Sequence, residues 1–340
     1  MLPAFFFPRS LRRPALLAAL CVALPACAEH YDDHPAAAAF IEELVAEDGF
    51  EREALEALFA RAERQESILE AIARPAEKTK PWHEYRDIFL TDRRIDEGIA
   101  FLAEHGDTLA AAEAESGVPA PVIAAVLGVE TYYGRITGSY AVIDALSTLA
   151  FDYPPRSPFF RRELRHFLLL AREQGLDPAA LEGSYAGAMG YGQFMPSSYR
   201  SYAVDFDGDG LADIWNNPAD AIGSVANYLA RHGWRPGEPV AAPATLAAAV
   251  PEDWFDDGLD AERTVAELAD GGLVAARELP ADAPALALAL AGDDGPEYWI
   301  GLPNFYFITR YNHSALYAMA VYQLSERLRA GEGEGEGEGA

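Results

Sequence analysis

Apolar residues recur every three to four positions through most of this chain, the spacing of one face of a helix. The pattern predicts one helical stretch over residues 35–74, ended by Pro75 and Pro81. Capping residues or prolines mark the starts of the later helices, and glycines mark most of their ends. These helices are predicted from Thr91 to Gly106, from Asp107 to about Gly117, over 121–130, from Ser157 to Gly175, from Asn217 to Gly233 and over about 313–329.

Residues 235–300 differ from the rest because they are rich in Ala, Pro, Asp and Gly. Their short apolar runs at 284–290 and 298–302 are typical of strands, so we expect an insertion that carries a small sheet. The Gly-Glu repeat of residues 331–340 has nothing to bury, and we expect a disordered tail. The predicted fold class is mainly α (α+β), with a small β-containing insertion.

The first 28 residues have the layout of a bacterial export signal. Arg9, Arg12 and Arg13 precede a short apolar stretch, and no acidic residue occurs before Glu29. Residues 24–27 resemble a lipobox, in which Cys27 would be lipidated and would anchor the protein to the outer membrane. Residues 26–28 also fit an ordinary cleavage site, which would release a soluble periplasmic protein after Ala28. We favour the lipoprotein, and both alternatives place the protein in the periplasm.

Charge and cysteine content exclude several classes of function. The chain has 26 Lys+Arg against 54 Asp+Glu, a net charge of −28, which becomes −31 once the signal is removed. Nucleic-acid binding requires a cationic face, so we expect no such partner. Both cysteines, Cys21 and Cys27, lie in the signal, which excludes a disulfide framework or a cysteine metal site in the mature chain.

Glu130 is the most informative acidic residue. On a helix it shares a face with Ile123, Val126 and Leu127, so its carboxyl would lie at the apolar face. Burial raises the pKa of a carboxyl group, and a protonated glutamic acid is what general acid catalysis of glycosidic cleavage requires. The alternative is a glutamate at a helix end that turns toward water before Gly134.

Two other segments have the composition of a binding groove. Residues 184–199 place three glycines within six residues among Met and aromatic side chains, which indicates backbone that another group approaches closely. A flexible connector is the alternative, although Met189 and Phe194 argue against it. Residues 305–314 combine aromatic rings, which stack on sugars, with Asn312, whose amide can bond sugar hydroxyl and acetamido groups.

An acidic loop matches the spacing of a calcium-binding EF-hand loop. Its oxygen donors fit positions 1, 3, 5, 7 and 9, and Gly210 permits the sharp turn at position 6. The bidentate Glu usual at position 12 is replaced by Asn216, which weakens the expected affinity. We expect a structural Ca²⁺ and no organic cofactor; an Asp/Gly-rich turn without metal is the alternative. The candidate ligands are Asp205, Asp207, Asp209, Leu211 through its carbonyl, Asp213 and Asn216.

Taken in order, these motifs resemble the family of membrane-bound lytic murein transglycosylase B, glycoside hydrolase family 103. The resemblance spans about residues 35–329 and includes Glu130–Gly134, Ser184–Ser198, the acidic loop and Tyr311–Ser314. It implies a lysozyme-like core at about 85–234 plus 301–329, with an N-terminal helical part and the insertion at about 235–300 beside it. It also implies non-hydrolytic cleavage of the MurNAc-β-1,4-GlcNAc bond of peptidoglycan, leaving 1,6-anhydro-MurNAc ends, in cell-wall turnover.

The resemblance also implies roles for single residues. Glu130 would be the only catalytic acid/base, and Ca²⁺ in the acidic loop would not be catalytic. Arg156 falls where the family tends to show two arginines, but Pro155 precedes it here. Residues implied to line the substrate groove are Ser184, Gln193, Tyr311, Asn312 and Arg156.

Glycosidases usually employ two carboxyl groups, and a second one is hard to assign here. Asp144 and Asp152 are candidates only because they are near in sequence. The family's solution is assistance by the N-acetyl group of the substrate. The alternatives are a muramidase that uses water and a catalytically silent peptidoglycan-binding scaffold. Glycan strands are the expected partner, and cell-wall synthase complexes are further candidates.

Overall fold

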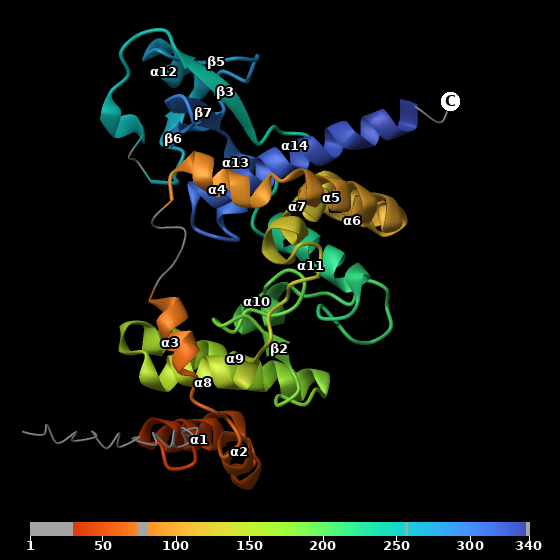
Figure 1. Cartoon of the computed structure of the whole chain (residues 1–340), viewed down its shortest axis with the longest axis vertical. Helices are drawn as coiled ribbons and strands as arrows, with labels where there is room; N and C mark the ends of the chain where they lie inside the picture. The colour runs from red at the N-terminus through yellow and green to blue at the C-terminus, as the bar shows by residue number, and fades with distance from the viewer. Residues whose placement is uncertain (1–29, 74–79, 256–257, 338–340) are drawn as a thin grey trace, which may run out of the picture.

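The computed structural model describes residues 30–73, 80–255 and 258–337. The predicted signal segment, including Cys27, lies outside these residues. The described chain is mainly helical and carries one five-stranded sheet, so the predicted fold class is confirmed. The molecule is elongated, with the first two helices at one end and the five-stranded sheet at the other (Figure 1).

The N-terminal part contains three helices where the periodicity predicts one: α1 (Pro35–Asp48), α2 (Arg52–Phe59) and α3 (Glu66–Ile72). Gly49 ends α1 because it adopts a left-handed conformation (φ 66°), and its N–H donates to the Leu44 carbonyl. The apolar spacing continues across this break, so periodicity alone did not reveal it. α3 packs on α8 (Val142–Asp152), a helix that the sequence analysis did not predict.

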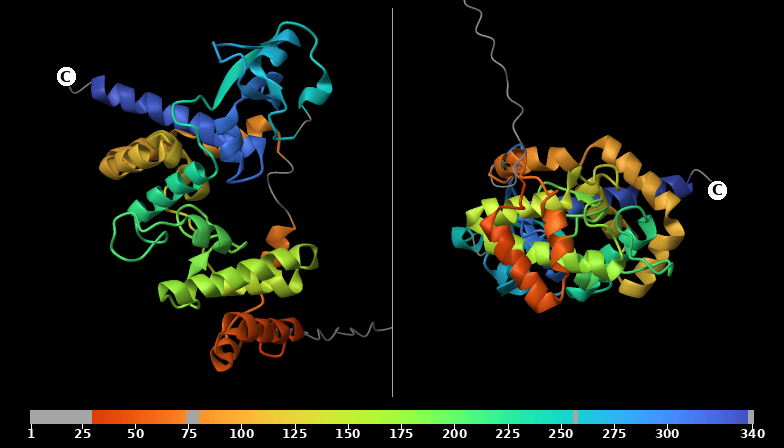
Figure 2. Two further views of the ribbon diagram at one scale, coloured as in Figure 1. Left: turned by 180° about the vertical axis from the view of Figure 1, so that it is seen from behind. Right: turned by 90° about the horizontal axis from the view of Figure 1, so that it is seen from below.

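The central helices follow the prediction closely. They are α5 (Asp92–Glu104), α6 (Gly106–Ser116), α7 (Ala120–Thr131), α9 (Ser157–Gln174) and α11 (Pro218–Arg231). Thr91 caps α5 as expected, because its hydroxyl accepts the Arg94 N–H at 3.2 Å. α7 has no solvent-facing side: residues 121–129 are all buried. It packs against α5, α6, α11 and α14 (Ala315–Gly337), which surround it in both views from the side (Figures 1 and 2).

Shorter elements connect these helices. They are α4 (Trp82–Phe89), which packs on α14, a 3-10 turn at Pro154–Arg156, α10 (Pro196–Tyr202) and α13 (Pro303–Thr309). A two-stranded antiparallel ribbon pairs β1 (Tyr140–Ala141) with β2 (Glu182–Gly183). This ribbon joins the segment that follows α7 to the glycine-rich segment at 184–199.

The insertion forms an antiparallel sheet of order β4-β6-β7-β3-β5. Its strands are β3 (Ala241–Leu246), β4 (Arg263–Thr264), β5 (Leu273–Ala275), β6 (Pro284–Ala291) and β7 (Pro296–Gly301), and α12 (Val265–Asp270) covers it. The fully buried Asn304 of α13 fixes the chain that enters the sheet. Its amide donates to the carbonyls of Arg235 and Glu238 and accepts the Arg235 N–H, at 2.8–2.9 Å.

The last helix corrects one prediction. α14 continues to Gly337 instead of ending at about 329, so residues 331–337 are helical and not disordered. A helix whose first turns are packed can propagate, because each added residue gains one hydrogen bond without a new nucleation cost. Residues 338–340 lie outside the described residues.

Across the described ranges, no single helix is both long and apolar enough to cross a membrane. The bent pair of α6 and α7, with 111° between its two helices, meets the test by length and composition alone.

Candidate active site

Glu130 occupies the last turn of α7 and is half-buried. Ile123, Val126 and Leu127 are completely buried, so the predicted apolar environment on its face is confirmed. The Glu130 carboxylate accepts a hydrogen bond from the Tyr317 hydroxyl of α14, with 2.6 Å between the two oxygens. This carboxyl is therefore held by a named partner 187 residues away and is not a helix end turned freely toward water.

The turn that follows Glu130 is unusually constrained. Tyr132 and Tyr133 both have positive φ angles, 57° and 59°, which non-glycine residues rarely adopt. The Thr131 hydroxyl accepts the Gly134 N–H at 2.9 Å and donates to the Tyr191 carbonyl at 2.7 Å. The end of α7 is thus tied directly to the glycine-rich segment.

A wall of tyrosines surrounds the Glu130 carboxyl. The rings of Tyr311 and Tyr317 are stacked with 6.4 Å between centroids, and Tyr228 lies 4.7 Å from Tyr311. The Tyr311 hydroxyl donates to the Gly192 carbonyl at 2.5 Å, and the Tyr228 hydroxyl donates to the Arg310 carbonyl at 2.6 Å. Tyr311, predicted from the sequence, is therefore beside the candidate acid and fixes the glycine-rich segment.

The same environment keeps these phenols protonated. Burial, followed by the negative charge of Glu130, raises the pKa of Tyr311 and of Tyr317 well above the usual tyrosine value. Burial raises the pKa of Tyr228 to about 12. Tyr317 is accordingly a neutral hydrogen-bond donor to Glu130 over the whole physiological pH range.

The glycine-rich segment is ordered, so it is not a flexible connector. Met189 and Phe194 exchange two backbone hydrogen bonds, and both side chains are buried. Gln193 has φ 50°, and its amide donates to the carbonyls of Thr137 and Gly190, both at 3.0 Å. The Ser184 hydroxyl accepts the Ala188 N–H at 3.1 Å. Both predicted groove residues are half-buried in a segment whose middle, at Tyr191 and Gly192, contacts the α7 turn and Tyr311.

The other two predicted groove residues differ in their surroundings. Asn312 is half-buried and directly follows Tyr311. Arg156 is exposed at the 3-10 turn before α9, where its guanidinium lies 4.5 Å from the Phe159 ring centroid. Its described contacts are with Phe159 and Phe160 and do not connect it to Glu130.

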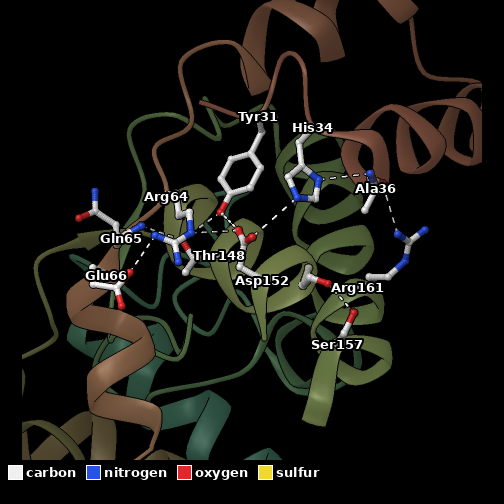
Figure 3. A network of polar contacts seen from close by, with 11 residues as sticks. Tyr31, His34, Ala36, Arg64, Gln65, Glu66, Thr148, Asp152, Ser157 and Arg161 are labelled. Atoms are coloured by element: carbon white, nitrogen blue, oxygen red, sulfur yellow. Dashed lines mark hydrogen bonds and ion pairs between the residues drawn. The ribbon is translucent and has the colours of Figure 1, made fainter. Parts of the chain in front are cut away.

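Asp144 and Asp152, the candidates for a second acid, contact the N-terminal segment. Figure 3 shows Asp152 beside Tyr31 and His34. Asp152 accepts the Tyr31 hydroxyl at 2.7 Å. Asp144 accepts the Glu63 N–H at 2.9 Å, and burial raises the pKa of Asp144. The two carboxyl groups fasten residues 31–65 to α8, so a catalytic role for them is not supported.

Sequence reasoning missed two members of the site, Tyr317 and Tyr228. Both read as core aromatics on amphipathic helices, and both are indeed nearly buried. Only their hydroxyl groups separate them from ordinary core residues. The signal that could have found Tyr317 is its position five to six residues after Tyr311 and Asn312, which the sequence already assigned to the site.

The acidic loop brings together three of its six predicted ligands. One carboxylate oxygen from each of Asp205, Asp207 and Asp209 lies within 4.8 Å of the others, and the three residues are exposed. Asp205 also accepts the N–H groups of Gly208, Asp209 and Gly210 at 2.8–3.0 Å, which closes the loop. Hard oxygen donors in this arrangement fit Ca²⁺.

The rest of the loop has a different set of partners. Asn216 donates its amide to Asp213 at 3.2 Å, and the Leu211 carbonyl accepts the Asp213 N–H at 3.0 Å. Asp220, which sequence reasoning missed, is fully buried and accepts the N–H groups of Phe206 and Asp213, both at 2.7 Å. Asp220 therefore supports the loop from inside.

The family model described as "Transglycosylase SLT domain" matches residues 32–326, and the chain belongs to this family. Membrane-bound lytic murein transglycosylase B of Escherichia coli (strain K12) is 44% identical over 305 residues, which cover 87% of this chain and 83% of that protein. The crystal structure of soluble lytic transglycosylase SltB1 from Pseudomonas aeruginosa is 55% identical, with a TM-score of 0.84 over 88% of this chain and 100% of that one. The Escherichia coli lytic transglycosylase Slt35 in complex with calcium is 43% identical, with a TM-score of 0.81 over 88% of this chain and 95% of that one.

Proposed function

We propose that this chain is a peptidoglycan lytic transglycosylase, which cleaves the MurNAc-β-1,4-GlcNAc bond and leaves 1,6-anhydro-MurNAc ends. The observation that carries the proposal is the Glu130 carboxyl, half-buried at the end of an apolar helix, bonded to the Tyr317 hydroxyl and flanked by a tyrosine wall. The lytic transglycosylase names of its relatives support the proposal. A more distant relative, SltB3 from Pseudomonas aeruginosa (32% identical over 86% of this chain and 78% of that one, TM-score 0.76), has been solved in complex with NAG-anhNAM-pentapeptide.

Glu130 acts first as the acid. It gives its proton to the glycosidic oxygen, the bond from C1 of MurNAc to that oxygen breaks, and GlcNAc leaves. The acetamido oxygen of MurNAc bonds C1 and forms an oxazolinium, which takes the place of a second carboxylate. This assignment suits a site in which Asp144 and Asp152 bond the N-terminal segment instead of the substrate.

Glu130 then acts as the base. Its carboxylate takes the proton of the MurNAc O6 hydroxyl while O6 attacks C1 and displaces the acetamido oxygen. The proton returns to Glu130, and no water is consumed. Tyr317 donates to the carboxylate in the intermediate state, when the charge on Glu130 is greatest and a charge-assisted hydrogen bond is strongest.

The surrounding residues bind and orient the strand. The half-buried Tyr311, against which the buried Tyr228 packs, offers a ring for stacking on sugar, while Ser184, Gln193 and Asn312 offer hydroxyl and amide groups for the sugar substituents. Arg156 contributes a cation at greater distance along the groove, where peptide carboxylates of the substrate would pass. In this proposal the groove runs between the glycine-rich segment and the start of α14.

Calcium has a structural part only. Asp205, Asp207 and Asp209 would hold the ion, which would offset two of the three clustered negative charges and fasten the chain between α10 and α11. The Slt35 relative solved with calcium supports this proposal.

The site of action is the periplasm. One relative is named membrane-bound and another soluble, so both processing alternatives have a precedent. We favour attachment to the outer membrane through a lipid on Cys27 over release after Ala28.

Product analysis tests the function directly. Purified protein is incubated with sacculi, and the muropeptides are identified by mass spectrometry. Anhydro ends are expected; reducing ends would indicate a muramidase, and no cleavage would indicate a binding scaffold. Glu130→Gln should lower product formation by about 10³-fold while sacculus binding persists, since general acid–base catalysis is worth about 10²–10⁴-fold. Glu70→Gln, an exposed glutamate on α3, is the matched control and should retain activity.

A further inference from the structure

α5 packs against the turn that follows Glu130 and makes four contacts with it. The Tyr133 hydroxyl donates to the Arg94 carbonyl at 3.0 Å, and the Arg94 guanidinium lies 4.4 Å from the Tyr132 ring centroid. Arg135 pairs with Glu97 at 2.9 Å. A Cβ at Gly98 would overlap the Tyr133 hydroxyl, so only glycine leaves room for this ring. One face of α5 therefore fits the 132–135 turn.

Arg94 is an unusual residue to find in that place. Its side chain is 9% exposed, and its Nε is buried without a hydrogen-bond partner. The guanidinium donates to the Ile88 carbonyl and lies between the rings of Phe89, at 5.3 Å, and Tyr132. Burying a cation that keeps an unsatisfied donor costs free energy. The stacking of the guanidinium on Tyr132 offsets part of that cost.

What Arg94 holds is the backbone that ends the catalytic helix. Tyr132 and Tyr133 are consecutive non-glycine residues in the left-handed region, a conformation that persists only where the surroundings impose it. Arg94 contacts both: its guanidinium faces the ring of one and its carbonyl accepts the hydroxyl of the other. We propose that Arg94 is a positioning residue, which fixes the 132–135 turn and thereby the direction of the Glu130 carboxyl. This inference rests on the proposed function for its kinetic consequence, but not for its structural one.

Hydrogen exchange tests the structural part without any assay of activity. The amides of Tyr133, Gly134 and Ile136 bond to the carbonyl of Leu127, the hydroxyl of Thr131 and the carbonyl of Thr131, respectively. In Arg94→Met these three amides should exchange about tenfold faster or more, while those of α9 stay unchanged. Arg93→Met is the matched control: Arg93 is 75% exposed in its side chain and lies 5.7 Å from the same ring, so exchange should not change.

Kinetics test the catalytic part. Arg94→Met should lower kcat for anhydro-muropeptide release about tenfold with KM within twofold, whereas a change of global stability alone would lower the active fraction and leave kcat per folded molecule intact. Arg94→Lys keeps the charge but not the planar stacking group, so its kcat should lie between those of the wild type and Arg94→Met. If Arg94→Met does not fold, Tyr132→Leu removes the stacking partner and should give the same pattern.

The outcomes are separable. Unchanged exchange at the three amides, or an equal effect of Arg93→Met, overturns the role of Arg94 whatever the enzyme does. Normal kcat in an Arg94→Met protein whose turn exchanges fast overturns the link between the turn and Glu130. A wild-type protein that makes no anhydro product refutes the proposed function, and the exchange data still decide whether Arg94 holds the turn.

Discussion

At the scale of single residues, the Glu130–Tyr317 hydrogen bond joins the two halves of the site. The phenol has a pKa well above the usual value, so it stays protonated and keeps donating to the Glu130 carboxylate at neutral pH and above. Because hydrogen bonding to the carboxylate favours the charged form, Tyr317 tunes the same group that it orients.

We therefore expect Tyr317→Phe to change both rate and pH dependence. A hydrogen bond to a charged group contributes about 1.5–3 kcal/mol, so kcat/KM should fall roughly 10- to 100-fold. The lost donor favoured the carboxylate over the neutral acid. The basic limb of the kcat/KM profile, where the acid loses its proton, should move to higher pH. A profile measured from pH 4 to 9 on a soluble glycan substrate checks this. An unmoved limb would show that the phenol does not act on Glu130.

The site was only partly predictable from the sequence, for reasons that are local. Glu130 stands out because an acid on an apolar helix face breaks the pattern, and the α7 environment confirms it. Tyr317 does not break any pattern, since a buried tyrosine on a helix is ordinary until its hydroxyl partner is known. The left-handed Tyr132 and Tyr133 could not be predicted, because residues of this type rarely adopt that conformation and tertiary contacts impose it.

At the scale of elements, the acidic loop is closed by its own hydrogen bonds and supported by the buried Asp220. Three clustered carboxylates repel one another, and a divalent cation would convert that repulsion into attraction. In this loop Asn216 replaces the usual last ligand, a bidentate Glu, which predicts a modest affinity for Ca²⁺.

Removal of calcium should consequently lower the melting temperature. A ligand at ten to a hundred times its Kd stabilises by about 1–3 kcal/mol, which shifts the melting temperature of a chain of this size by about 2–5 °C. Thermal unfolding with and without a chelator measures the shift, and Asp205→Asn should abolish it. Asp270→Asn, an exposed aspartate on α12, should keep the full response to the chelator. If the melting temperature of the wild-type protein does not change when chelator is added, the proposed metal site is wrong.

Helix ends matched the prediction at Thr91, whose hydroxyl caps α5, and at Gly175, which ends α9. The prediction failed at Gly49, where apolar spacing continued through a break, and beyond Ala330, where composition argued for disorder. At Gly49 a left-handed conformation ends the helix although the apolar spacing continues, and beyond Ala330 the helix propagates from its packed first turns. The local pattern of apolar residues contains neither effect.

At the scale of the whole molecule, the N-terminal helices lie at the far end from the sheet (Figures 1 and 2). Tyr31 is already 1% exposed and bonded to α8, only four residues after Cys27. Four residues span at most about 14 Å. A lipid on Cys27 would therefore hold the folded protein close to the membrane surface, with α1 and α2 nearest to it.

Cell fractionation of Cys27→Ser tests the anchor. We expect the wild-type protein in the outer-membrane fraction and the variant in the soluble periplasmic fraction, with equal activity on sacculi after purification. Ala26→Ser, which keeps the cysteine, is the control and should stay in the membrane fraction. Recovery of the wild type in the soluble fraction would favour cleavage after Ala28.

Because α7 is enclosed by other helices, saturation mutagenesis of this enzyme should give a distinctive result along the helix. None of residues 121–129 is exposed to solvent, so a polar substitution at any of them should destabilise the fold. Losses of function along this segment should therefore come with low yields of protein. Position 130 should be the exception, where abundance survives and turnover does not. Plotting abundance against activity along this one segment would reveal the reactive group without any substrate bound.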